Sequence, residues 1–170
     1  LRRDMGVAFQ GGALFGSMTV GENVELPLRE HTKLDKKTIR IMSRMKLELV
    51  SLAGFENFLP AELSGGMIKR AALARAIVMD PKLLFFDEPS AGLDPVSAHR
   101  LDDLILELRE SLGTNMVVVT HELASIFAIG NNSVYLDADK KTMTAAGDPK
   151  KLLEETKDPD LRRFLTRGKS

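Results

Sequence analysis

Residues 83–88, with the sequence LLFFDE, decide the fold of this chain. An uninterrupted apolar run of this length is typical of a strand buried inside a parallel sheet. Two carboxylates, Asp87 and Glu88, follow at the point where such a strand would leave the sheet. Open α/β sheets bind their ligands at that edge. The pair therefore predicts a candidate site there; the alternative is an acidic pair that only begins a turn before Pro89.

Further apolar runs and helical patterns alternate on both sides of this stretch. Residues 5–9 and 116–120 predict two more buried strands. The Ala- and Leu-rich residues 67–79 predict a helix, and residues 94–113 predict another that begins at Asp-Pro and ends at Gly. This alternation predicts an α/β fold whose parallel sheet carries helices on both faces.

The segment from residue 17 to 62 departs from this alternation and is expected to be a helical subdomain. Thr19 and Glu22 have the spacing of a capping box, and Pro27 is expected to break or end the helix that they begin. A second, amphipathic helix is expected over 35–53, with apolar residues at three- and four-residue steps. These apolar residues are Ile39, Met42, Met45, Leu49 and Leu52.

The end of the chain predicts smaller elements. A helix is expected through Ile129, and residues 133–136 and 142–145 have the pattern of a hairpin. Asp148 and Pro149 are expected to begin the next helix. A last helix is expected over 158–166, either as a surface helix or as a docking site for a small partner or second subunit.

Composition excludes several classes of protein. The chain has 170 residues, with 24 Lys plus Arg against 24 Asp plus Glu, and this neutral balance argues against a nucleic-acid partner. It has no cysteine, which excludes a disulfide scaffold, a thiolate zinc site and a cysteine nucleophile. Its apolar runs are far shorter than the roughly 20 residues that span a bilayer.

Three further places carry chemistry. Ser64, Gly65 and Gly66 precede a predicted helix, where a hydroxyl, exposed amides and the helix N-terminus could bind an anion. The alternative is an ordinary Ser-capped helix. His121 follows a predicted strand and could contact a phosphate oxygen or be a solvated side chain. Gln10, also at a strand end, has an amide oxygen suited to a magnesium ligand.

In this order along the chain, the motifs resemble the ATPase subunit of ABC transporters. Gln10 is similar to the Q-loop glutamine, and residues 63–67, LSGGM, to the family signature. Residues 86–88 are similar to the end of Walker B, residues 90–94, SAGLD, to the D-loop, and His121 to the switch histidine. The resemblance implies a P-loop NTPase fold of the RecA-like type with an added ABC α-helical subdomain.

Four details resemble the Mla-type ATPases, which power Mce-associated phospholipid transport between the membranes of Gram-negative bacteria. They are residues 12–15, GALF, residues 27–32, PLREHT, Met67 in place of Gln at the end of the signature, and residues 160–165, DLRRFL. The resemblance implies a location on the cytoplasmic face of the inner membrane, peripheral to the bilayer.

The phosphate-gripping loop of the family, G-x-x-x-x-G-K-[ST], has no match in the sequence. The nearest stretch, residues 11–18, has Ser17 in place of Lys and Met18 in place of Ser or Thr. In the family that loop precedes the Q-loop, and only nine residues precede Gln10. We therefore expect an N-terminally truncated ATPase domain that alone hydrolyses no ATP. Its strand at 116–120 is expected to have an unpaired edge that favours aggregation.

The resemblance also implies a division of the chain. Residues 1–16 would be the Q-loop strand and loop, and 17–80 the helical subdomain with the signature. Residues 81–146 would be the Walker B, D-loop and switch core, and 147–170 the C-terminal helices.

For the intact protein the resemblance implies ATP and Mg²⁺ as cofactors and a head-to-tail dimer with a second ATPase subunit. Glu88 would polarise the attacking water and His121 would assist catalysis, while Asp87 and Gln10 would organise Mg²⁺. Bound ATP would also contact the other subunit's equivalents of Ser64, Gly65 and Gly66, and Asp94 would communicate across the dimer. A membrane permease, expected together with an Mce-type lipid-binding protein, would dock near Leu14, Phe15 and Met18, although these residues could equally be core.

Three other interpretations remain. An ABC-type ATPase of DNA repair or chromosome structure would need a long coiled coil, but only 52 residues separate Gln10 from Leu63. A degenerate, non-catalytic module would be free to lose Asp87, Glu88 and His121, which are present. An ABC ATPase for another cargo differs only in the Mla-like details.

Overall fold

The computed structural model describes residues 4–167. The first three and last three residues, which belong to the predicted segments 1–16 and 147–170, lie outside the described residues. The chain forms two compact units, a first unit of residues 1–120 and a second unit of residues 121–170.

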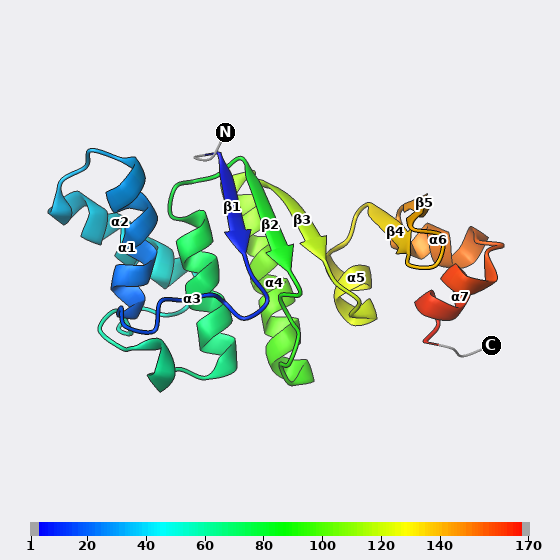
Figure 1. The fold of residues 1–170 in the computed structure, drawn as a ribbon, viewed down its shortest axis with the longest axis horizontal. Coiled ribbons are helices and arrows are strands. Elements are labelled where there is room, and N and C mark those ends of the chain that lie inside the picture. Colours follow the sequence, from blue (N-terminus) through cyan, green and yellow to red (C-terminus); the bar gives the residue numbers. More distant parts are fainter. Residues whose placement is uncertain (1–3, 168–170) are drawn as a thin grey trace. The chain divides into compact units, whose positions relative to one another are not determined.

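The first unit is built on a parallel sheet of three described strands. They are β1 (Met5–Ala8), β2 (Leu83–Asp87) and β3 (Asn115–Val119), in the order β1-β2-β3. β2 is central, with Ala8 beside Phe86 and Phe86 beside Val118. Figure 1 shows the three strands pointing the same way, so their carboxyl ends share one edge. Among the described strands β3 pairs only with β2, in agreement with the predicted unpaired edge.

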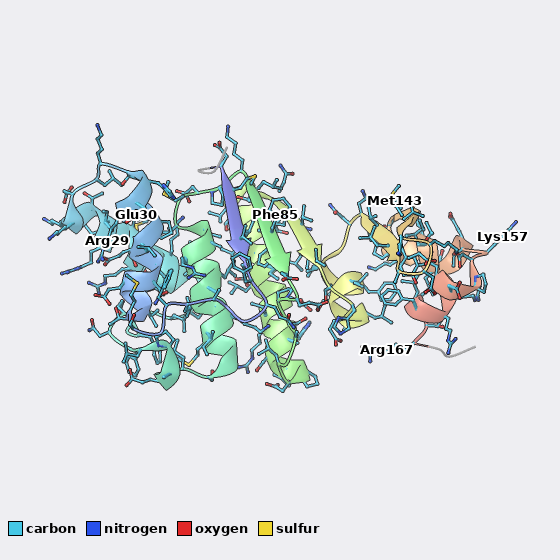
Figure 2. The ribbon with its side chains drawn as sticks, viewed as in Figure 1. Arg29, Glu30, Phe85, Met143, Lys157 and Arg167 are labelled. Carbon is cyan, nitrogen blue, oxygen red and sulfur yellow. The ribbon has the colours of Figure 1, made fainter. Side chains whose placement is uncertain are left out.

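One face of this sheet is buried and the other is not. Leu84 and Phe86 are at most 2% exposed, whereas Val117 is 43% and Val119 58% exposed. Phe85, labelled in Figure 2, is the register partner of Val117 on the less buried face. The prediction that residues 5–9 and 116–120 are fully buried strands is therefore wrong. A continuous apolar run does not distinguish one covered face from two, because both faces then carry apolar side chains.

A close approach explains how the buried face is covered. Helix α3 (Gly65–Ile77) packs against β1. A Cβ atom on Gly6 would lie 2.3 Å from the carbonyl oxygen of Ala76. Gly6 therefore lets the helix backbone come directly onto the strand.

Two more helices form the helical part of the first unit, α1 (Val20–His31) and α2 (Lys36–Leu49). The capping box of Thr19 and Glu22 is confirmed. Pro27 lies inside α1, so the predicted break is wrong. A proline costs an interior helix about 3 kcal/mol, and the burial of Val24 and Leu28 on one face of α1 favours its continuation.

Helix α2 confirms an amphipathic helix but corrects its buried face. Ile39, Ser43 and Leu47 are buried, whereas Met45 is 59% and Leu49 43% exposed. Ser43 tolerates burial because its hydroxyl donates a hydrogen bond to the carbonyl oxygen of Gly21, at 3.4 Å. The helix also ends four residues earlier than expected.

A 3₁₀ turn, η1 (Pro60–Glu62), precedes α3, and α4 (Pro95–Leu112) completes the first unit. Asp94 is the N-cap of α4, and Gly113 ends it with a φ of 61°, as predicted. This left-handed conformation favours glycine.

The second unit contains a helix, a hairpin and two short helices. They are α5 (Leu123–Ile129), β4 (Ser133–Asp137), β5 (Thr142–Gly147), α6 (Pro149–Glu155) and α7 (Pro159–Leu165). The hairpin, the helix that begins at Asp148 and Pro149, and the last helix are confirmed. Leu123, Leu161 and Leu165 form a small buried core.

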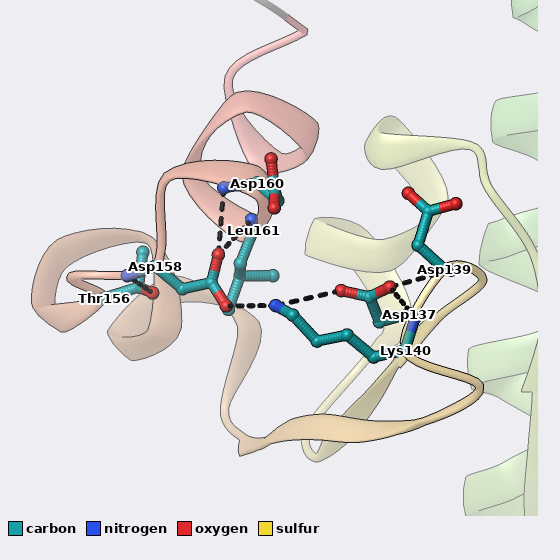
Figure 3. Close-up of polar contacts among 7 residues, drawn as sticks. All are labelled: Asp137, Asp139, Lys140, Thr156, Asp158, Asp160 and Leu161. Atoms are coloured by element: carbon teal, nitrogen blue, oxygen red, sulfur yellow. Dashed lines mark hydrogen bonds and ion pairs between the residues drawn. The ribbon is translucent and has the colours of Figure 1, made fainter.

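Polar contacts around Lys140 tie the hairpin to α7 (Figure 3). The Lys140 Nζ atom lies 3.2 Å from a carboxylate oxygen of Asp137 and 3.6 Å from one of Asp158, the N-cap of α7. Main-chain hydrogen bonds, foremost from Lys140 and from Leu161, lower the pKa values of Asp137 and Asp158 respectively.

Candidate functional site

The predicted residues Gln10, Asp87 and Glu88 lie at the carboxyl edge of the sheet. Gln10 comes two residues after β1, and Asp87 ends β2. Because Ala8 is the register partner of Phe86, the two strands end at the same level. Gln10 and Asp87 are exposed there, as a ligand-binding edge requires.

Glu88 is held by its main chain in an unusual conformation. Its φ of 47° lies in the left-handed region, where side chains other than glycine are strained. Its N–H donates to the carbonyl oxygen of Val119 at 2.9 Å, which fixes it to the end of the neighbouring strand. The Thr120 hydroxyl donates to the Glu88 Oε2 atom at 3.1 Å. The carboxylate is therefore oriented, and strain of this kind clusters at functional sites.

Lys69, from the middle of α3, supports the same residue. Its ammonium donates to the carbonyl oxygen of Glu88 at 3.1 Å. Burial lowers the pKa of Lys69, and the Glu88 carboxylate partly opposes this by attracting the positive charge. Lys69 and Thr120 were absent from the sequence prediction, because only the fold brings them to Glu88.

A second group of predicted residues lines one groove of about 780 Å³ in the first unit. Ser64, Gly65 and Gly66 contribute from the start of α3, and Asp94 contributes from the start of α4. Residues about 30 positions apart in the sequence are thereby brought together. Leu93, the neighbour of Asp94 in the sequence, lies against the start of α3, since a Cβ atom on Gly65 would be 3.9 Å from the Cδ2 atom of Leu93.

The groove fits a phosphate. Gly65 and Gly66 leave the backbone of the first helical turn open, so the N–H groups there can approach an anion. Ser64 caps the helix by accepting a hydrogen bond from the Met67 N–H at 3.3 Å, which keeps its hydroxyl at this end. Arg70 and Arg100 also line the groove and add positive charge, while Asp94, Asp103 and Glu107 line it with carboxylates. Burial, with repulsion from Arg100, lowers the pKa of Arg70.

Asp94 has a structural role that its position already predicted. Its carboxylate accepts hydrogen bonds from the N–H groups of Val96 and Ser97, both at 3.0 Å. A hydrogen bond from the Ser97 side chain, followed by that from the Ser97 N–H, lowers the pKa of Asp94. Asp94 is therefore held as an anion at the rim of the groove.

The donor set also fits magnesium. Mg²⁺ prefers oxygen ligands and usually keeps several waters, with only one or two protein carboxylates. Asp87 and Gln10 offer a carboxylate and an amide oxygen at one edge of the sheet. Within residues 4–167 there is no group of three or more His, Cys, Asp or Glu suited to hold a metal by themselves.

His121 is the one predicted site residue that belongs to the second unit. It is exposed and lines a shallow cavity of about 610 Å³ with Tyr135, Phe164 and other residues of that unit.

The loop after Gln10 depends on two side chains that the sequence analysis missed. Asn23 of α1 is fully buried; it accepts from the Phe15 N–H at 2.8 Å and donates to the carbonyl oxygens of Phe15, Met18 and Thr19. Arg75 of α3 donates to two carbonyl oxygens earlier in the loop. The available signal for Asn23 was its helical spacing beside the apolar residues Val20 and Val24, whereas the sequence around Arg75 carries no signal of its contacts.

Comparison with known protein families identifies the class. The model of the ABC transporter family matches residues 1–91, and the chain belongs to this family. The α/β fold of the chain agrees with this family. The structure of cbiO1 from Clostridium perfringens, part of the ABC transporter complex cbiONQ, superimposes with a TM-score of 0.81 at 28% identity. That comparison covers 91% of this chain and 61% of the other.

Individual relatives narrow the class. The chain is 45% identical over 165 residues to MlaF, the intermembrane phospholipid transport system ATP-binding protein of Escherichia coli strain K12; this covers 97% of the chain and 60% of MlaF. It is 42% identical to the probable ribonucleotide transport ATP-binding protein mkl of Mycobacterium leprae, covering 97% of the chain and 47% of mkl. The chain thus spans about three fifths of the length of MlaF.

A solved ATP-binding cassette provides one more comparison. Its dimeric, post-hydrolysis structure with ADP and Pi bound matches with a TM-score of 0.75 at 31% identity, over 86% of this chain and 64% of that one. Within residues 4–167 no helix is both long and apolar enough to cross a membrane.

Proposed function

We propose that this chain is the greater part of the ATP-hydrolysing subunit of an ABC transporter that moves phospholipid between the membranes of a Gram-negative bacterium. The single observation that carries the ATPase is the pairing of the signature residues with the D-loop in one groove of about 780 Å³. The phospholipid cargo rests on the similarity to MlaF.

Glu88 is the residue we assign to the attacking water. Its carboxylate is oriented by Thr120, and its main chain is fixed by Val119. A carboxylate held in this way can accept a hydrogen bond from water and aim it at a phosphate. We assign His121 to hydrogen bonding of a phosphate oxygen as that oxygen gains charge.

Asp87 and Gln10 would hold Mg²⁺, which neutralises developing charge on the phosphate oxygens when it is bound. The chain's own contribution is to place both oxygen donors at one sheet edge, beside Glu88. Since the sequence has no G-x-x-x-x-G-K-[ST] loop, we expect the 170-residue chain alone to show no ATPase activity.

Ser64, Gly65 and Gly66 would bind the phosphates of a nucleotide held by a second ATPase subunit. In this head-to-tail arrangement each signature completes the other subunit's site. The dimeric ATP-binding cassette supports such a pairing. Asp94 would communicate between the two subunits of the dimer, because it lies in the same groove as the signature residues.

The loop after Gln10 would meet a membrane permease. Phe15 is 52% exposed although its main chain is fixed on both sides by Asn23. Core packing therefore does not hold this ring, and we assign it to contact with an apolar surface of the permease. Leu14 and Met18 are half-buried beside it.

The remaining partners follow from the Mla-like sequence. We propose that the permease works with an Mce-type lipid-binding protein. The ATPase would sit on the cytoplasmic face of the inner membrane, peripheral to the bilayer. No nucleic-acid partner is proposed, since the chain has a net charge of zero.

The decisive variant is Glu88→Gln in a protein that carries this chain together with a phosphate-binding loop. The amide keeps the size of the side chain but cannot accept a proton, so we expect hydrolysis to fall by roughly 100- to 10,000-fold. Binding of labelled ATP should be unchanged. Glu110→Gln, an exposed change on α4, is the matched control and should hydrolyse ATP normally.

Near-normal turnover of Glu88→Gln would contradict the role of Glu88, and lack of turnover in the unchanged protein would contradict the ATPase. Reconstitution with the permease in vesicles tests the cargo. Labelled phospholipid should then move only when ATP is hydrolysed, and ATP-driven movement of a ribonucleotide instead would favour the mkl-like alternative.

A further inference from the structure

Arg75 forms an unusual pair of contacts near the end of α3. Its two terminal nitrogens donate to the carbonyl oxygens of Gly12 and Ala13, at 2.8 and 2.7 Å. The residues are more than 60 positions apart in the sequence. Burial lowers the pKa of Arg75, so its charge is costly there unless hydrogen bonds compensate. A guanidinium on two neighbouring carbonyls provides that compensation with fixed geometry.

The segment that Arg75 holds is strained. Gly12 has a φ of 76° and Ala13 a φ of 47°, both in the left-handed region. Alanine adopts this region only at a cost, so the turn needs external contacts to persist. Gly12 closes a turn over residues 9–12 by donating its N–H to the carbonyl oxygen of Phe9 at 2.8 Å. Gln10 lies inside this turn.

Further contacts fix the same turn against α3. A Cβ atom on Gly12 would lie 2.7 Å from the Cγ2 atom of Ile68, so the turn lies directly on the helix. Ser64 caps the start of that helix, and Arg75 lies about 16 Å further along it at 1.5 Å per residue. One continuous helix thus joins the phosphate groove to the turn around Gln10.

We propose that Arg75 is the positioning residue that holds the Gln10 turn to the signature helix, so that Gln10 and the groove keep one relative geometry. Arg75 touches neither nucleotide nor metal in this role. Its effect on catalysis rests on the proposed ATPase function, whereas its effect on the turn does not.

A spin label tests the turn directly in the full 170-residue chain. The chain has no cysteine, so Gly11→Cys gives a single labelling site inside the turn. A Cβ atom on Gly11 meets nothing within 4 Å, so a cysteine side chain has room to start there. In Arg75→Met we expect the label's nanosecond motion to quicken by about twofold or more. In Arg75→Lys we expect an intermediate value, because an ammonium lacks the planar fork.

Two controls separate positioning from general loosening. Arg70→Met removes a similar pair of contacts, to the carbonyl oxygens of Val50 and Ser51, and should leave the Gly11→Cys spectrum unchanged. A label at Val96→Cys, on α4 and 61% exposed, should not respond to Arg75→Met. An unchanged Gly11→Cys spectrum in folded Arg75→Met overturns the proposal. If Arg75→Met does not fold, Arg75→Lys decides, and an unchanged spectrum there overturns it.

The catalytic consequence is measured in the protein that also carries a phosphate-binding loop. Because a small misplacement of a positioned group can cost up to about 100-fold in rate, kcat should fall by roughly 10- to 100-fold in Arg75→Met, with KM for ATP little changed. A mobile turn with normal kcat would overturn the link to catalysis. Absence of ATPase activity in the unchanged protein would instead contradict the proposed function and leave the spin-label result standing.

Discussion

Twenty of the buried apolar side chains described in this chain lie in the first unit, and three lie in the second. The first unit is held by a broad core under its sheet and helices. The second unit has Leu123, Leu161 and Leu165, together with short Asp-capped helices and the contacts of Lys140. Hydrophobic burial is only weakly sensitive to pH, whereas capping carboxylates titrate. The two units should therefore respond differently to core truncation and to acid.

The unit with the larger core also holds most of the predicted site residues. All the predicted site residues except His121 lie in the first unit. The left-handed main chain of Glu88 is a costly feature of the first unit, and a large core can offset it. The small core of the second unit could offset less strain of this kind.

The largest expected effect is that of Leu84→Ala in the first unit. Leu84 is fully buried in the central strand, and truncation of such a residue costs about 3 kcal/mol. Hydrogen exchange, followed peptide by peptide, should show faster exchange across residues 4–120. Leu34→Ala, at a side chain 42% exposed, is the control and should change little. Equal exchange in both variants would contradict the assigned core.

A smaller effect is expected for Leu161→Ala in the second unit. Leu161 is 2% exposed, but few buried neighbours surround it, so its loss should cost about 2 kcal/mol. The same exchange measurement should show the change in residues 121–167. Leu136→Ala, at a side chain 72% exposed on β4, should leave exchange unaltered. An effect of Leu161→Ala as large as that of Leu84→Ala would remove the distinction between the cores.

The smallest effect is expected from acid. The pKa values of Asp137 and Asp158 are lowered in the folded chain, so these carboxylates stabilise the second unit above about pH 4, the ordinary aspartate value. That contribution is lost as the pH falls through the lowered values. The protection of amides in residues 121–167, relative to their intrinsic exchange rates at each pH, should therefore fall below pH 4 more than core burial alone would allow.

Asp158→Asn makes this prediction specific. Asparagine still caps a helix but carries no charge to titrate. The variant should show a weaker pH dependence of exchange in the second unit. Asp103→Asn, an exposed change on α4, is the control and should leave that pH dependence as it is in the unchanged chain. An identical pH dependence in the unchanged chain and in Asp158→Asn would show that the charge of Asp158 does not stabilise this unit.

Local patterns predicted most of the elements because their causes are local. Thr19 and Glu22 cap α1 through neighbouring backbone, and the Asp-Pro starts of α4, α6 and α7 act within one turn. The predictions failed where packing decides. Pro27 stays within α1, and Met45 faces solvent while Ser43 is buried, because the neighbours of a helix choose its buried face.

The sequence by itself determined the family, since Gln10, the LSGGM signature and the Asp87–Glu88 pair occur in a recognisable order. It also determined which residues could act, because carboxylates, amides and exposed glycines have their chemistry wherever they lie. Only the tertiary structure decided which of them meet: Ser64 with Asp94 in one groove, Lys69 and Thr120 at Glu88. Arg75 reaches Gly12 across more than 60 residues in the same way. Such contacts depend on the packing of α3 against β1, and no periodicity or spacing in the chain encodes a long-range distance of that kind.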